Sequence, residues 1–176
     1  MKKSIVYLVI TLLATSFITA QEFNKGTNVI NAGVGLGGSY NIYASPSQSP
    51  VISASFERGI WEVPGPGVVS LGAYLGFKNY KYSNNDKWSY TIIGIRGAYH
   101  YNGLEVENLD VYGGVMASYN ILSYDDNRYG GLGSYGSRPS ATAFVGGRWY
   151  FGENFGVFAE AGYGVAYLTA GVSFRI

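Results

Sequence analysis

The chain contains no cysteine, one histidine and few charged residues, and these shortages narrow the kinds of protein it can be. Without cysteine the fold cannot be held by disulfide bonds. With a single histidine, His100, and no thiolate, a transition-metal cluster of Cys and His ligands is excluded. Charged residues make up 13% of the chain, where soluble domains carry about 25%. The surface is therefore short of the charge that keeps soluble proteins apart.

Long apolar runs are also missing. The run at residues 5–14 is shorter than the about 20 residues that a membrane-spanning helix needs. It follows two lysines and leads to a small residue, Ala20, which is the order of a secretory signal peptide. We therefore expect residues 1–20 to be a signal peptide that is removed, and residues 21–176 to form one domain. A retained N-terminal membrane anchor is the alternative.

Neither the charge nor the glycine pattern indicates a nucleic-acid or nucleotide ligand. Without the two leader lysines, 10 basic residues balance 11 acidic ones, so the charge gives no reason to propose nucleic acid as a partner, and we expect none. Gly33–Gly38 matches the G-x-G-x-x-G pattern of dinucleotide sites, but those sites need a helix directly after it. Ser39–Pro46 has no helical pattern. We interpret these glycines as strand positions and expect no cofactor.

What the sequence does contain is an alternation of apolar residues with small or polar ones, clearest at residues 155–176. A repeat of two residues is typical of β-strands. Residues that face each other across an antiparallel pair share one face, and here the apolar face changes from odd to even numbers. A turn of two or four residues around Val165 and Ala166 satisfies that parity and makes the segment a hairpin.

Six earlier segments alternate in the same way, which makes eight strands, and no segment has the pattern of an amphipathic helix. Each strand has one apolar face, and the opposite face is mostly Gly, Ser, Thr and Tyr. By parity, seven charged side chains lie on that opposite face. The first six expected strands are 28–37, 51–60, 69–78, 91–101, 109–121 and 140–151, and the seven charged residues are Glu57, Lys78, Arg96, Asp110, Arg148, Glu160 and Arg175.

In a soluble barrel the apolar face would point inward, whereas in a membrane barrel it faces lipid and the polar face lines the lumen. The signal peptide, the low charge and aromatic residues near strand ends favour the membrane barrel. The sequence therefore predicts an all-β fold, an eight-stranded antiparallel up-and-down transmembrane β-barrel. An even strand number puts both termini on the periplasmic side. Segments 41–50, 83–88, 122–139 and the turn near 165 then lie outside the cell, and segments 61–68, 102–108 and 152–154 lie in the periplasm.

Several segments also resemble a known family. They are Phe155–Gly164, Tyr167–Leu168, Ala170–Ile176, and the turn region with Gly59–Glu62 and Gly65–Gly67. The chain resembles the small bacterial outer-membrane β-barrel proteins of the OmpA/OmpX-like type, in the porin-like subfamily common in Bacteroidetes-type bacteria. The resemblance implies a bacterial outer-membrane location, contact with outer-membrane lipid and lipopolysaccharide, and insertion by the outer-membrane assembly machinery. That machinery reads an alternating C-terminal strand; this chain ends in Ile176, where an aromatic residue is usual, and retains Phe174.

The interior charges are the first candidate site. An eight-stranded barrel is just wide enough for side chains to fill, so buried charges must be paired. A three-residue turn at 152–154 sets Arg148 opposite Phe158 and diagonal to Glu160, which predicts an ion pair between Arg148 and Glu160. We interpret the network as structural, and a gate across a narrow pore is the alternative. Its expected members are Arg148, Glu160, Arg96, and Glu57 or Asp110.

The sole histidine raises the question of catalysis. Some outer-membrane enzymes that modify lipid use a histidine beside a serine. His100 is expected on the lumen face at the periplasmic end of its strand, away from the outer-leaflet lipid that such enzymes attack. We therefore expect no enzyme.

The external loop at 122–139 is the second candidate site. Its carboxylates beside Tyr and Arg suit a cation, a glycan or a protein ligand, and a solvated loop without a ligand is the simpler interpretation. The leading hypothesis is a structural or surface-interaction (adhesin-like) role through the extracellular loops. A narrow passive pore for ions or small solutes and a lipid-modifying enzyme are the alternatives. The possible contact residues are Tyr124, Asp125, Asp126, Arg128 and Tyr129.

Overall fold

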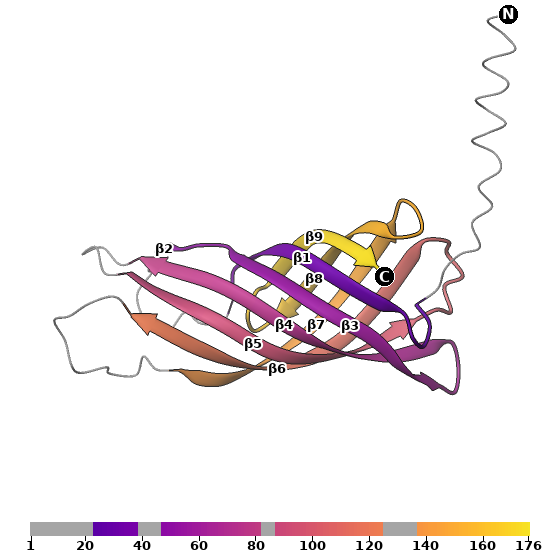
Figure 1. Cartoon of the computed structure of the whole chain (residues 1–176), viewed down its shortest axis with the longest axis horizontal. Helices are drawn as coiled ribbons and strands as arrows, with labels where there is room; N and C mark the ends of the chain where they lie inside the picture. The colour runs from indigo at the N-terminus through magenta and orange to yellow at the C-terminus, as the bar shows by residue number, and fades with distance from the viewer. Residues whose placement is uncertain (1–22, 39–46, 82–86, 125–136) are drawn as a thin grey trace, which may run out of the picture.

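The computed structural model describes residues 23–38, 47–81, 87–124 and 137–176. In these residues eight strands form a closed antiparallel barrel, which confirms the predicted fold class (Figure 1). The same residues contain no helix, and so none long and apolar enough to cross a membrane. The barrel strands are β1 (Asn28–Leu36), β3 (Val51–Val63), β4 (Gly67–Lys81), β5 (Lys87–Tyr101), β6 (Leu109–Tyr124), β7 (Arg138–Tyr150), β8 (Phe155–Tyr163) and β9 (Leu168–Arg175), and a two-residue strand β2 (Ser47–Gln48) pairs with β4.

The C-terminal turns have the register that the alternation predicts. Between β7 and β8, Arg148 pairs with Phe158, and the amide of Phe151 donates to the carbonyl of Phe155 across the turn. Four residues, 164–167, join β8 to β9. An even loop keeps the apolar side chains of both strands on one face.

The barrel closes where β9 pairs with β1, from Val29 opposite Arg175 to Leu36 opposite Leu168. Inside this seam the side-chain amide of Asn31 donates to Ser55 Oγ at 3.0 Å, and its carbonyl oxygen accepts from Ser173 Oγ at 2.5 Å. One buried side chain on β1 thus bridges both neighbouring strands. Because buried polar groups are costly when unpaired, these bonds favour the closed register.

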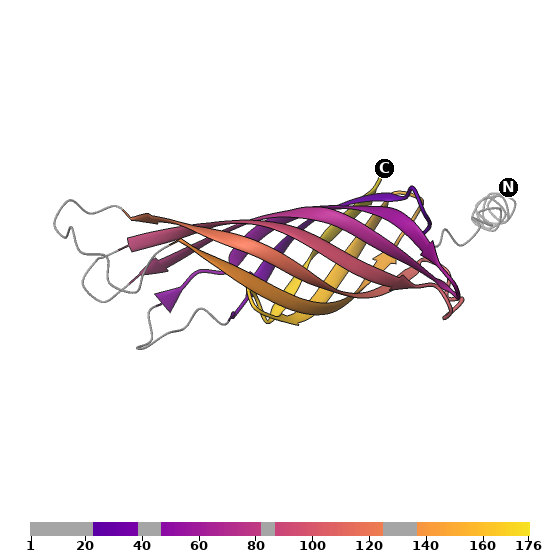
Figure 2. The same cartoon turned by 90° about the horizontal axis from the view of Figure 1, so that it is seen from below.

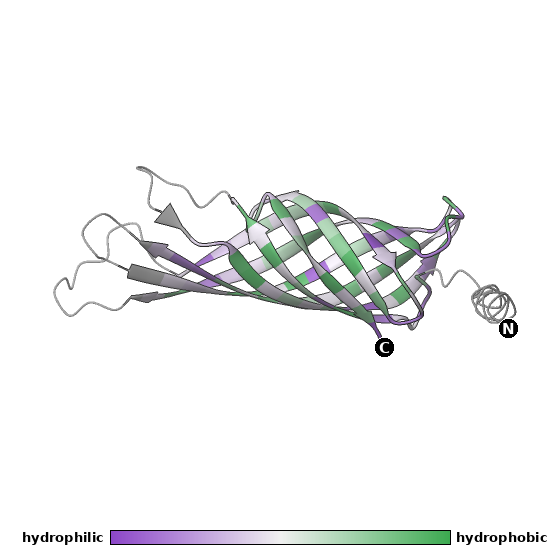
Figure 3. Ribbon diagram, turned by 90° about the horizontal axis from the view of Figure 1, so that it is seen from above, coloured by the Kyte–Doolittle hydropathy of each residue, from purple (hydrophilic) through white to green (hydrophobic). Residues whose placement is uncertain are grey.

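The two faces of the wall are segregated as the parity predicts, with apolar side chains outside and charges inside. Hydrophobic and less hydrophobic residues alternate along the strands (Figure 3). Ile95 is 71% exposed on the outer face, whereas Glu57 and Arg148 are fully buried. Arg58 is an exception: it is exposed and donates to Asn28 Oδ1 at 3.2 Å. The seven charged residues assigned to the inner face, Glu57, Lys78, Arg96, Asp110, Arg148, Glu160 and Arg175, are buried or nearly so.

The alternation of β3 breaks at a β-bulge between Gly59 and Trp61. The alternation of the expected strand 51–60 puts Ile60 on the apolar outer face, together with Ile52, but the bulge inserts an extra residue. Trp61 takes the outer position at 53% exposure, and Ile60 is half-buried. The turn predicted at 61–68 is also shorter than expected, because β3 continues to Val63 and β4 begins at Gly67.

Strands β4, β5 and β6 extend past the other strands at one end of the barrel (Figures 1 and 2). They contain 15, 15 and 16 residues, where β8 and β9 contain 9 and 8. The predicted loops at 83–88 and 122–139 therefore overlap with strands. β5 begins at Lys87, where it pairs with Lys81 of β4, and β6 continues to Tyr124 while β7 begins at Arg138.

The two ends of the barrel differ. The end that we call the termini end carries Phe23, Ile176 and the turns after β3, β5 and β7. The opposite end, called the loop end, carries the β8–β9 turn and the extended part of β4 to β6 (Figure 1). Both ends of the described chain therefore lie on the same side, as an even number of strands requires.

Candidate functional site

The structure brings the five residues of the expected charge network together inside the barrel. They come from five different strands: Glu57 from β3, Arg96 from β5, Asp110 from β6, Arg148 from β7 and Glu160 from β8. Each lies at an inward position of its strand because the alternation places it there. The two guanidinium groups carry the positive charge that faces the three carboxylates.

Arg148 holds the centre of the network. Its Nη2 donates to Glu57 Oε2 at 2.7 Å, and its Nη1 donates to Asp110 Oδ2 at 2.7 Å. Asp110 is its direct neighbour on β6, but β3 lies four strands away around the barrel. The Arg148–Glu57 ion pair therefore spans the lumen and connects opposite walls.

Arg96 connects Glu57 on β3 to Glu160 on β8. Its Nε lies 2.7 Å from Glu57 Oε1, and its Nη2 donates to Glu160 Oε1 at 2.6 Å. The hydroxyl of Tyr112 donates to the same Glu160 oxygen at 2.9 Å. A side chain at position 146 would not fit here, because a Cβ on Gly146 would lie 2.7 Å from Glu160 Cγ.

His100 and Ser70 extend the network towards the termini end. His100 Nδ1 lies 2.8 Å from Asp110 Oδ1, and His100 Nε2 lies 3.0 Å from Ser70 Oγ. A carboxylate only accepts hydrogen bonds, so Nδ1 is the donor in the first contact. Ser70, His100 and Asp110 are hydrogen-bonded in the order of a catalytic triad, but Ser70 and His100 are both fully buried. The same bonds hold the imidazole in place.

Aromatic rings cover the faces of both guanidinium groups. Arg148 Cζ lies 4.1 Å from the centroid of the Tyr112 ring, and Arg96 Cζ lies 4.2 Å from that of Phe144. Such stacking is favourable for a cation that has lost its water. The stacking offsets part of the cost of burying the two cations, and the carboxylates accept hydrogen bonds from the Nη atoms of both guanidinium groups. The interior is therefore packed as a polar core.

The β8–β9 turn closes the lumen at the loop end. Val165 and Ala166 point inward and are 2% and 9% exposed, and the Val165 amide donates to Thr142 Oγ1 at 3.3 Å. Below this turn, beside Arg96 and Glu160, a cavity of about 30 Å³ remains. That volume holds about one water molecule.

The ion pair that we predicted between Arg148 and Glu160 is wrong in its partners. Arg148 bonds to Glu57 and Asp110 instead, and Glu160 bonds to Arg96. The prediction assumed that Arg148 reaches sideways along the β7–β8 wall. A long side chain in a narrow barrel reaches across the axis instead, where a carboxylate on the opposite wall accepts two cations at once.

Sequence reasoning missed Ser70 and Tyr112 as members of the network, and placed His100 on the lumen face without a partner. The alternation along their strands puts all three residues on the inner face, and this pattern could have identified them. Their contacts depend on the relative heights of β4, β5 and β6, which the alternation alone does not set.

Of the candidate contact residues in the external loop, Tyr124 is the last residue of β6. Asp125, Asp126, Arg128 and Tyr129 lie outside the described residues, as does the expected signal peptide at 1–20.

The chain has no match among models of known protein families and none among curated proteins.

We predict that Arg148→Met lowers the free energy of unfolding by about 3–5 kcal/mol, because Glu57 and Asp110 lose a buried partner. A double-mutant cycle with Glu57→Gln should give a coupling energy above about 1 kcal/mol, and a cycle with Glu160→Gln a smaller one. Urea unfolding followed by tryptophan fluorescence measures both. Arg58→Met is the control, since an exposed arginine should change stability by less than about 0.5 kcal/mol. A larger coupling to Glu160 than to Glu57 would contradict the observed partners.

Proposed function

We propose that the chain is an outer-membrane barrel with a sealed lumen and a structural or surface-interaction role at its loop end. The observation that carries this proposal is the reversal of the usual burial pattern. Large apolar side chains are exposed all around the wall while charges fill the inside. Soluble monomers rarely expose a large continuous apolar surface. A lipid bilayer gives such a surface its preferred environment.

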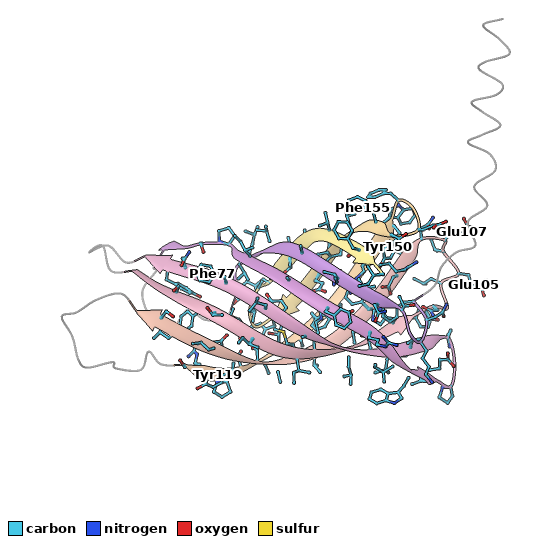
Figure 4. All side chains as sticks on the ribbon, viewed as in Figure 1. Phe77, Glu105, Glu107, Tyr119, Tyr150 and Phe155 are labelled. Atoms are coloured by element: carbon cyan, nitrogen blue, oxygen red, sulfur yellow. The ribbon has the colours of Figure 1, made fainter. Side chains whose placement is uncertain are left out.

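Aromatic residues near both ends of the wall support a membrane location. Near the termini end, the ring of Phe155 lies beside those of Phe151 and Phe174, with centroid distances of 6.2 and 5.3 Å. Phe77 and Tyr119 lie on the outer face towards the loop end (Figure 4). The eight steps of β8 from Phe155 to Tyr163 cover about 20 Å along the axis at a usual tilt, close to the about 25 Å apolar band of outer-membrane barrels.

The proposed orientation puts the termini end in the periplasm and the loop end outside the cell. An N-terminal signal peptide delivers the chain to the periplasm, from which the assembly machinery inserts barrels. The β9 strand supports this route, because Val172 and Phe174 alternate with Ser173 and Arg175 along it. The partners proposed on this basis are that machinery, outer-membrane lipid and lipopolysaccharide.

The filled interior favours this role over the two alternatives. A passive pore needs a continuous water path, whereas the Arg148–Glu57 ion pair crosses the lumen and Val165 blocks the loop end. A lipid-modifying enzyme needs an accessible nucleophile, whereas Ser70 is buried beneath its partners. We therefore propose a non-enzymatic barrel.

The extended sheet is the element suited to contacts outside the cell. In the part of the chain that the structure describes, β6 runs to Tyr124, beyond Asn120 opposite Arg138, its last pair with β7, and the Leu122 amide donates to Ser137 Oγ at 3.1 Å. A strand edge can pair with an extended segment of a partner, and adjoining residues 125–136 contain Asp, Arg and Tyr for side-chain contacts. The barrel would anchor this surface.

We predict that Ile95→Lys destabilises the barrel in lipid by about 2–4 kcal/mol, because the charge would face the middle of the bilayer. Outer-membrane fractions should contain less of the variant in the folded form, which migrates differently on a gel before and after heating. Gly152→Lys, in the β7–β8 turn, adds the same charge at a site where a Cβ meets no atom within 4 Å, and should have little effect. A wild-type product that is fully soluble in the periplasm, or an Ile95→Lys variant that folds normally, would refute the membrane location.

For the surface role, we predict that replacing residues 125–136 with a short Gly-Ser turn abolishes binding while the barrel still folds. The measurement is binding of detergent-purified protein to immobilised glycans and extracellular-matrix proteins. Glu153→Gln, in a turn at the termini end, is the control and should bind as the wild type does. The role is contradicted when the loop variant and the wild type bind the same set of ligands.

A further inference from the structure

The residues before β1 fold back into the termini end of the barrel. Phe23 is 1% exposed, and its ring stacks on the imidazole of His100 with centroids 3.6 Å apart and planes inclined by 6°. Its carbonyl oxygen accepts a hydrogen bond from Asn102 Nδ2 at 3.1 Å. With Val29 and Val68, Phe23 forms a small apolar cluster. The segment Phe23–Thr27 therefore covers the end of the charge network.

A tight turn holds the segment in this position. The Gly26 amide donates to the Gly59 carbonyl at 2.8 Å, and the Gly59 amide donates to the Thr27 carbonyl at 2.9 Å. Gly26 has a φ of 91°, which favours glycine. A Cβ on Gly59 would lie 2.3 Å from the carbonyl oxygen of Asn24. The bulge in β3 thus places a residue without a side chain where the segment must approach.

The segment contacts the wall at Gly59 of β3 and at Val29 and Val68 but belongs to none of the strand pairings. The β1 pairings begin at Asn28, opposite Arg58, and continue through the strand without any residue of the segment. Two backbone bonds to Gly59, one side-chain bond to Asn102, one ring stack on His100 and the apolar cluster with Val29 and Val68 hold it. Release of these contacts leaves every strand pairing of the barrel in place.

We propose that Phe23–Thr27 is a detachable plug that seals a pocket at the termini end of the lumen. When the plug is docked, Phe23 shields His100 from solvent. When it is released, the pocket opens with Ser70, His100 and Asp110 on its floor. The Arg148–Glu57 ion pair still closes the far side, so release gives access from one end without a through path.

The single histidine of the chain makes this plug testable. Purified full-length protein is treated with diethyl pyrocarbonate, and modification of the His100 peptide is followed by mass spectrometry. Phe23→Ala should raise the modification rate at least about tenfold, since local opening controls access. Gly59→Ala, which blocks docking while keeping Phe23, should raise it as well. Phe151→Ala removes a 66% exposed aromatic at the same end and is the matched control, with no change expected.

Hydrogen exchange of the wild-type protein tests whether the plug detaches. The Gly26 amide should exchange at least about tenfold faster than the amide of Asn31 in β1, because the plug opens without the strands. The proposal is overturned by equal modification of His100 in the wild type and both variants. It is also overturned by equal exchange at Gly26 and Asn31, or by loss of the β-sheet circular dichroism signal in Phe23→Ala, because the segment would then be part of the barrel's cooperative fold.

Discussion

The ion pair between Arg148 and Glu57 is the interaction on which the interior depends. It connects strands on opposite sides of the barrel, and both side chains are fully buried. Two charges without water are tolerable only when every neighbouring group compensates them. Arg96 from β5, and Asp110 and the ring of Tyr112 from β6, provide that compensation, so it comes from strands other than those of the central pair. The requirement to satisfy one buried pair therefore organises most of the lumen.

The same requirement explains why both ends are covered. Water entering beside the network would compete for its donors and acceptors and weaken the ion pairs. Val165 lies over the network from the β8–β9 turn, and Phe23 lies over it from the segment before β1. Neither residue belongs to a barrel strand. Residues outside the strands therefore cover both ends of the lumen, and the two covering segments can differ in stability.

The alternation of side chains was sufficient to predict the wall but not the interior. Parity placed Glu57, Arg96 and Glu160 inside correctly, and it required an even turn of two or four residues, of which the structure has four. It failed at Ile60, because a bulge adds one residue without a signal in the hydrophobic pattern. It also failed for the partner of Arg148. That partner depends on which strands face each other across the closed barrel and at what height, and the register of β6 against β7 is not fixed by a long connecting loop.

The claim that the lumen is sealed is tested most directly by recording current through the full-length protein in planar lipid bilayers. A barrel crossed by the Arg148–Glu57 pair and covered at both ends should give no discrete conductance steps at any protein density that yields folded insertion. Stable, reproducible steps from the wild-type protein would show a continuous water path and would contradict the sealed lumen.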